Sequence, residues 1–73
     1  MDHMPIVEPL SNGLSAMIVA SGQDGDFTVV YTLMRGKDRL PGHRHQLMAR
    51  FATRDAAYAA AKADAERRAG DIG

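Results

Sequence analysis

The residues with the clearest chemical potential are two histidines on either side of an arginine, His43-Arg44-His45. In an extended segment both imidazoles point to the same side, where they could act as two metal ligands. A third ligand at a defined spacing is missing, although Asp38 and His3 could supply one. The alternative is a polar loop whose imidazoles titrate near neutral pH. We favour the loop and expect no bound metal.

Catalytic residue patterns are absent from the sequence. The chain has no cysteine, which excludes disulfides and thiolate metal sites and favours a reducing compartment. No serine lies in a nucleophile elbow, no glycine-rich phosphate loop precedes a helix, and no two carboxylates are placed together for acid–base work. We therefore expect neither enzyme activity nor a cofactor. The N-terminus lacks a secretion signal and the longest apolar run is short, so we expect a soluble cytoplasmic protein without membrane association.

Charge is segregated along the chain although the net charge is zero. Residues 1–34 carry four carboxylates and neither lysine nor arginine, whereas residues 35–54 carry six cations and one carboxylate. These cations are Arg35, Lys37, Arg39, Arg44, Arg50 and Arg54. Such a segment could bind nucleic acid or another acidic partner, which is our alternative functional hypothesis. The competing explanation is a solvated loop that balances the acidic half of the same sheet.

The element that must position these residues is a strand at 26–34, the longest run of β-branched and aromatic residues. A second strand at 14–20 precedes it, and Asp24-Gly25 between them is typical of a two-residue hairpin turn. Closing the hairpin at this turn pairs Ile18 with Tyr31. The resulting register gathers one face that is apolar apart from the tyrosine hydroxyl. Its members are Leu14, Ala16, Ile18, Ala20, Phe27, Val29, Tyr31 and Leu33.

The flanking segments complete an antiparallel meander. Residues 1–10 contain two prolines and are expected to form an extended arm or a short edge strand. Residues 35–44 contain Gly36 and Pro41-Gly42 and are expected to form a loop. A third strand is then expected at 46–52.

A helix is predicted at 54–69, where half of the residues are alanine. Thr53 or Asp55 can cap its start, and Gly70 can end it. Two alanine stripes could face the sheet, and the sequence does not choose between them: Ala56, Ala59, Ala60 and Ala63, or Ala57, Ala61 and Ala65. The expected fold class is α+β: one domain spanning residues 1–73, with a three-stranded, or four-stranded, antiparallel meander sheet packed on one C-terminal helix.

One helix covers only one face of such a sheet, so the other face should be open. Its apolar character suggests an interaction surface, and we predict a non-catalytic module that forms a homodimer or docks a protein there. The candidate binding residues are Met17, Val19, Val30, Thr32, Met34, Met48 and Arg50. Two competing explanations are that the arm with Ile6-Val7 folds over this face, or that this face is merely solvated. Base stacking is disfavoured because Phe27, Tyr31 and Phe51 should point into the core.

The entry into the helix resembles that of many small uncharacterised bacterial domains. The segment that carries the resemblance is Phe51-Ala52-Thr53-Arg54-Asp55-Ala56-Ala57. The resemblance covers the last third of the chain and implies a β-β-β-α domain in which the Phe fills the core, the Thr caps and the Ala packs. It carries over no catalytic residue. Double-stranded RNA-binding domains share three strands and a final helix, but this chain lacks their first helix and the lysine-rich start of their last one.

Overall fold

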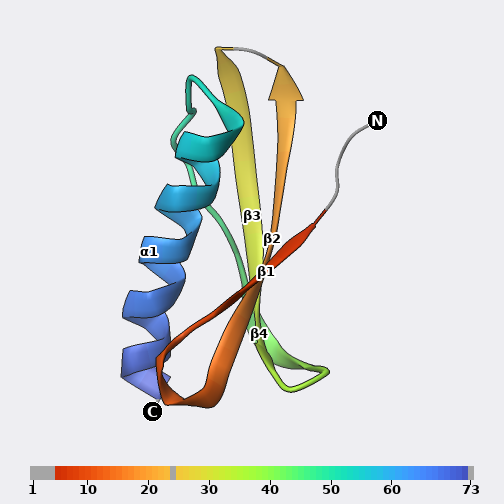
Figure 1. Ribbon diagram of the computed structural model, residues 1–73, viewed down its shortest axis with the longest axis vertical. Coiled ribbons are helices and arrows are strands. Elements are labelled where there is room, and N and C mark those ends of the chain that lie inside the picture. The colour runs from red at the N-terminus through yellow and green to blue at the C-terminus, as the bar shows by residue number, and fades with distance from the viewer. Residues whose placement is uncertain (1–4, 24, 73) are drawn as a thin grey trace.

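The computed structural model describes residues 5–23 and 25–72, which form four strands and one long helix. The elements are β1 (Ile6–Pro9), β2 (Leu14–Gln23), β3 (Asp26–Arg35), β4 (Asp38–Gln46) and α1 (Arg54–Ile72), with a short 3-10 turn at Ser11–Gly13. The strands make one antiparallel sheet in the order β1-β2-β3-β4, and α1 lies across one of its faces (Figure 1). The predicted α+β meander is confirmed in its four-stranded form, with the N-terminal segment as a short edge strand.

The β2–β3 hairpin has the predicted register. Ile18 pairs with Tyr31, and the pairing continues to Gln23 opposite Asp26. Gly25 in the turn has a φ of +84°, a conformation that glycine adopts without a Cβ penalty. Asp24, the other predicted turn residue, lies outside the described residues. The hairpin therefore fixes which side chains of β2 and β3 face the helix.

The third strand is where the prediction was wrong. Residues expected to form a loop at 35–44 instead form the β3–β4 hairpin, in which Arg35 pairs with Asp38 and Gly36 adopts a φ of +62°. Pro41 is tolerated because β4 is an edge strand, where a missing N–H costs least. The pairing also shifts register between Thr32 and Met34, so β4 contains an irregular bulge.

The segment expected to be a strand at 46–52 is mostly irregular but still follows β3. The Leu47 N–H donates to the Val29 carbonyl at 3.1 Å. Phe51 and Phe27 exchange two backbone hydrogen bonds of 2.9 Å, an isolated bridge. These contacts bring the chain alongside β3 and deliver it to the start of α1.

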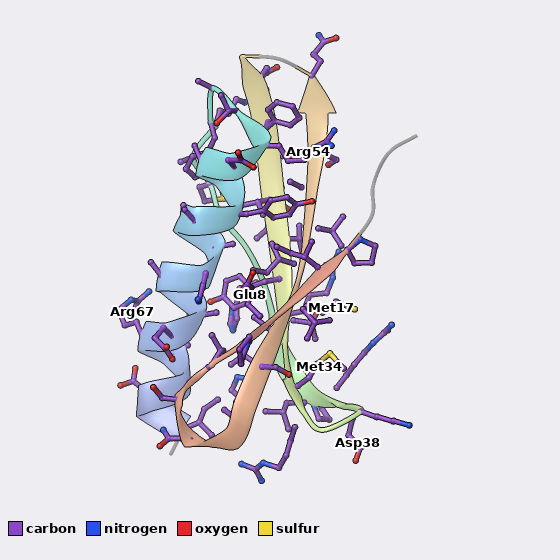
Figure 2. All side chains as sticks on the ribbon, viewed as in Figure 1. Glu8, Met17, Met34, Asp38, Arg54 and Arg67 are labelled. Carbon is purple, nitrogen blue, oxygen red and sulfur yellow. The ribbon has the colours of Figure 1, made fainter. Side chains whose placement is uncertain are left out.

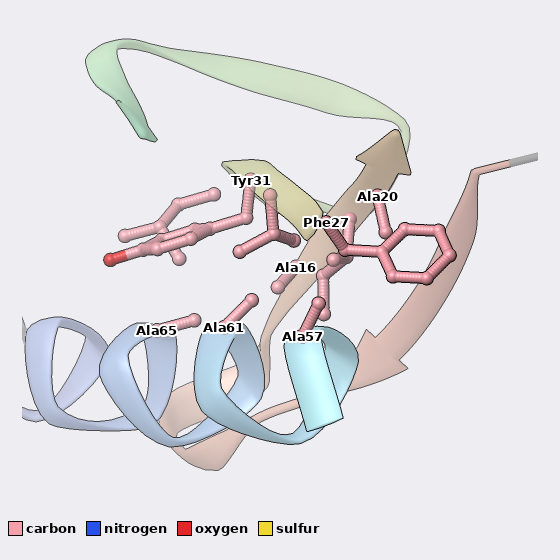
Figure 3. Packing of buried hydrophobic residues seen from close by; sticks show 10 residues of the cluster. Ala16, Ala20, Phe27, Tyr31, Ala57, Ala61 and Ala65 are labelled. Carbon is pink, nitrogen blue, oxygen red and sulfur yellow. The ribbon is translucent and has the colours of Figure 1, made fainter. Parts of the chain in front are cut away.

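The core lies between the sheet and one alanine stripe of α1 (Figure 3). Ala57, Ala61, Ala65 and Ala69 are buried, which decides between the two stripes that the sequence left open. All eight sheet residues of the predicted apolar face are buried as well. Because alanine side chains are small, the helix lies close against the larger side chains of the sheet, among which Tyr31, Ile18, Leu33 and Val29 are fully buried.

The start of α1 was predicted correctly, whereas its end was not. The Thr53 hydroxyl accepts a hydrogen bond from the Ala56 N–H at 3.1 Å, as expected of an N-cap. Gly70 does not end the helix, which continues to Ile72. A helical glycine costs about 1 kcal/mol relative to alanine, and two contacts offset this cost. Ile72 packs against the core, and the Asn12 side-chain amide donates to the Ala69 carbonyl at 3.1 Å.

Candidate functional site

The face of the sheet away from α1 is built from cross-strand rows of paired residues. Paired residues in an antiparallel sheet share a face, so the register defines each row. The rows are Val7, Met17, Thr32 and Arg44; Val19, Val30 and Gln46; and Ser15, Met34 and Arg39. Met17 and Met34 lie on the side of the sheet away from the helix (Figure 2). β1 lies beside β2 rather than over this face, and Val7 is 60% exposed.

This open face is hollowed into a groove of about 510 Å³, which we call the sheet groove. Its floor consists of Met17, Val19, Ser21, Val30 and Thr32, and its wall of Arg39, Leu40, Pro41, Gly42 and Arg44. The wall comes from the bulged part of β4, so the irregular pairing turns a flat sheet face into a concave one. Thr32 is only 9% exposed although the helix lies on the other face. The wall residues Leu40 to Gly42 were not predicted from the sequence, because Pro41-Gly42 is equally typical of a loop.

Two residues of the predicted binding patch lie elsewhere. Met48 is 94% exposed and borders a crevice between the end of β4 and α1, together with Arg68. Arg50 forms an ion pair with Asp26 at 2.5 Å, near the β2–β3 turn. Both were assigned to the open face through the expected strand at 46–52, which does not form.

The basic segment is also divided by the fold. Arg54 lies over the ring of Phe27 at 5.6 Å, at the end of the molecule opposite Asp38 (Figure 2). Arg35 pairs with Leu14 and therefore projects from the helix-side face, and Lys37 is in the β3–β4 turn. Only Arg39 and Arg44 among the six predicted cations line the sheet groove.

Three acidic residues form ion pairs with cations outside the β3–β4 hairpin. Glu8 pairs with Lys62 of α1 at 3.5 Å, and Asp26 pairs with Arg50. Asp64 pairs with two arginines of its own helix. Within residues 5–23 and 25–72, the side chains of four cations of the β3–β4 hairpin form neither an ion pair nor a hydrogen bond: Arg35, Lys37, Arg39 and Arg44. In the described chain, the acidic residues of β1 and β3 therefore do not neutralise this hairpin.

A second polar cluster joins β3 to α1. The Tyr31 hydroxyl donates to Asp64 Oδ2 at 2.5 Å, and Arg68 Nε donates to the same oxygen at 3.1 Å. Burial and the bond to Asp64 raise the pKa of Tyr31. Burial opposes ionisation of Asp64, but hydrogen bonds from Tyr31, Arg67 and Arg68 outweigh it and lower its pKa to about 2. A neutral phenol and a fully paired carboxylate are suited to anchoring the helix rather than to catalysis.

His43 and His45 lie at the edge of this cluster. The His45 ring is 5.5 Å from that of Tyr31 and 6.2 Å from that of His43, between ring centroids. Burial, Arg68 and His43 lower the pKa of His45, and its Nε2 is buried without a hydrogen-bond partner in the described chain. Among residues 5–23 and 25–72, no three His, Cys, Asp or Glu side chains come together as a metal site would require. His3, a suggested third ligand, lies outside the described residues.

Comparisons of the chain with protein-family models, with curated proteins and with solved structures find no match. In the described part of the chain, no helix combines the length and apolar character needed to span a membrane. The geometry of the sheet groove and the polar cluster is therefore the basis for any functional assignment.

Proposed function

We propose that the protein is a non-catalytic interaction module whose sheet groove binds a segment of another protein. The supporting observation is a concave, mostly apolar floor on the sheet face opposite α1. Concave surfaces lined by apolar side chains and a few polar groups are typical of binding sites. The groove lining includes hydroxyl groups of Ser21 and Thr32 but neither a histidine nor a carboxylate that could activate them.

A foreign segment fits the groove better than a second copy of the chain. A two-fold dimer brings the same patch of both copies together, so Arg39 and Arg44 of both copies would be gathered at one interface whose lining holds no carboxylate. Like charges across an interface are unfavourable.

Nucleic acid is the less favoured occupant. Proteins that bind single strands on an open sheet present aromatic rings to the bases. Phe27 and Tyr31 are buried on the helix side, at 4% and 0% exposure, and no aromatic residue lines the groove. Double-stranded nucleic acid would require a broader basic surface than Arg39 and Arg44 provide.

Peptide selection tests the proposal. Peptides from a displayed random library are selected on the wild-type protein and then measured against Val30→Lys, which places a charge on the groove floor. The matched control is Ala59→Lys, which adds the same charge to an exposed position of α1. Circular dichroism checks folding, and Met17→Lys replaces Val30→Lys if the latter unfolds.

We expect selected peptides to bind the wild type and Ala59→Lys equally, to lose affinity for Val30→Lys, and to shift the methyl NMR signals of Met17 and Val19. Peptides that bind all three proteins equally would contradict the proposal. So would light scattering that reveals a dimer which Val30→Lys dissociates, because self-association would then occupy the groove.

A further inference from the structure

We infer that the segment bound in the sheet groove is acidic, with apolar side chains on the floor and carboxylates along the β4 side. This inference rests on the proposed function and adds the charge and the orientation of the partner. It follows from the arrangement of the cross-strand rows and from the ion pairs that the hairpin cations do not make.

The open face changes from apolar side chains on β1, β2 and β3 to arginines on β4. The row that begins at exposed Val7 in β1 crosses Met17 and Thr32 and ends at Arg44. The neighbouring row crosses Ser15 and Met34 and ends at Arg39. Both arginines therefore lie on β4, at one side of the floor. A partner that covers the floor meets apolar side chains first and guanidinium groups along one flank only.

These guanidinium groups are available to a partner. Arg39 and Arg44 are exposed and form no ion pair within residues 5–23 and 25–72. Arginine binds carboxylates in a bidentate geometry, and its planar group also packs on apolar surface. Carboxylates next to a bound apolar side chain would satisfy both arginines, whereas a neutral segment would leave them unpaired at the edge of the interface.

The rest of the hairpin strengthens the same preference. Arg35, on the helix-side face, and Lys37, in the turn, are also exposed, and their side chains form no ion pair in the described chain. Residues 35–46 carry a single carboxylate, Asp38. Exposed like charges of this kind attract an oppositely charged partner during encounter and accelerate association at low salt. The hairpin would thus favour an acidic segment before any apolar contact forms.

Three labelled peptides test the inference. The first has leucines at its centre and glutamates on both sides, the second has glutamine in place of glutamate, and the third has lysine. Fluorescence anisotropy should show the glutamate peptide binding about tenfold more tightly than the lysine peptide and about threefold more tightly than the glutamine peptide. The advantage over glutamine should disappear as salt is raised, because salt screens exposed charges.

A pair of protein variants locates the effect. Arg44→Gln should weaken the glutamate peptide about threefold and leave the glutamine peptide unchanged. Lys62→Gln removes the same charge from α1, outside the groove lining, and should change neither. Arg44→Glu should reverse the preference between the glutamate and lysine peptides.

The outcomes separate this inference from the proposed function. If the glutamate and glutamine peptides bind equally and both lose affinity for Val30→Lys, the acidic preference is wrong and protein docking stands. If neither peptide binds and no library peptide depends on Val30, both ideas fail. If a DNA oligonucleotide displaces the glutamate peptide and binds more tightly, the hairpin serves nucleic acid and the inference is overturned.

Discussion

The Tyr31 hydroxyl donates a hydrogen bond of 2.5 Å to Oδ2 of Asp64 and thereby connects the middle of β3 to α1. The bond lies at the edge of the core, where the ring of Tyr31 is fully buried. Arg67 and Arg68 complete the coordination of the carboxylate from the helix side. The cluster therefore sets the position of the helix along the sheet, a role that uniform alanine packing alone would define less well.

Tyr31→Phe should lower the free energy of unfolding by about 1–2 kcal/mol, because it removes one hydrogen bond to a charged acceptor and leaves the ring in place. Urea unfolding followed by circular dichroism measures the change. The expected far-UV spectrum is unaltered, since the core keeps its shape. An unchanged free energy of unfolding would show that the bond is matched by water in the unfolded chain and does not hold the helix.

Asp64 should make stability depend on acid. Its pKa is lowered to about 2 in the folded protein, whereas an unfolded aspartate titrates near 3.9. Between these two pKa values the unfolded state therefore binds more protons than the folded state. Ionised Asp64 stabilises the folded protein by up to about 2 kcal/mol above pH 4, and this stabilisation is lost as the pH falls toward 2.

Asp64→Asn should be less stable than the wild type at neutral pH and should lose less stability between about pH 4 and pH 2. Asp55→Asn is the matched control, because Asp55 lies in the exposed first turn of α1 and should shift stability by no more than about 0.5 kcal/mol. Unfolding curves across this pH range measure both. Parallel curves for the wild type and Asp64→Asn would contradict the assigned ionisation.

His45 should add a separate loss of stability at higher pH than Asp64. Its pKa is lowered by burial, by Arg68 and by His43, against the attraction of Asp64. The unfolded state therefore binds the proton more readily, and stability should fall as the pH drops through the ordinary range of histidine. His45→Gln should reduce this loss, and an NMR titration of the wild type should place the His45 signal below that range. A His45 that titrates at or above it would refute the prediction.

Ala61→Leu should destabilise the protein by about 1–3 kcal/mol, because Ala61 is fully buried against the sheet and a larger side chain must displace the helix. Leucine and alanine have similar helix propensities, so backbone preference contributes little. Ala59→Leu on the exposed side of α1 is the control and should change stability by less than about 0.5 kcal/mol. Thermal unfolding of both variants distinguishes packing from propensity.

Local chemistry explains which parts of the fold were predictable. The β2–β3 register followed from a two-residue turn and from alternation that a slip of one residue would destroy. The alanine-rich composition of residues 54–69 specified a helix, yet not which stripe is buried, because that depends on the sheet it packs against. The helix passes Gly70 because Asn12 and Ile72 supply tertiary contacts that the local sequence does not reveal.

The site was harder to predict because it depends on β4. Pro41-Gly42 is compatible with a loop and with a bulged edge strand, and only the position of β4 in the sheet decides between them. The apolar side chains at 47–51 suggested a strand, although they provide only a few backbone contacts to β3. The open-face residues of β2 and β3 were predicted. The sequence did not indicate that Arg39 and Arg44 lie on the same face as these residues while Arg50 and Arg54 lie elsewhere.

The bulge in β4 contributes both to the groove wall and to the core, because Leu40 contacts both. It lies between two paired stretches, in which Arg39 is opposite Met34 and Arg44 is opposite Thr32. Exchanges at exposed Pro41 would reshape the groove wall, whereas Leu40 also packs against the core and His43 lines a crevice with Arg68 and Ile72 of α1. The proposed binding preference could therefore be changed through Pro41 while Leu40 and the core keep their contacts.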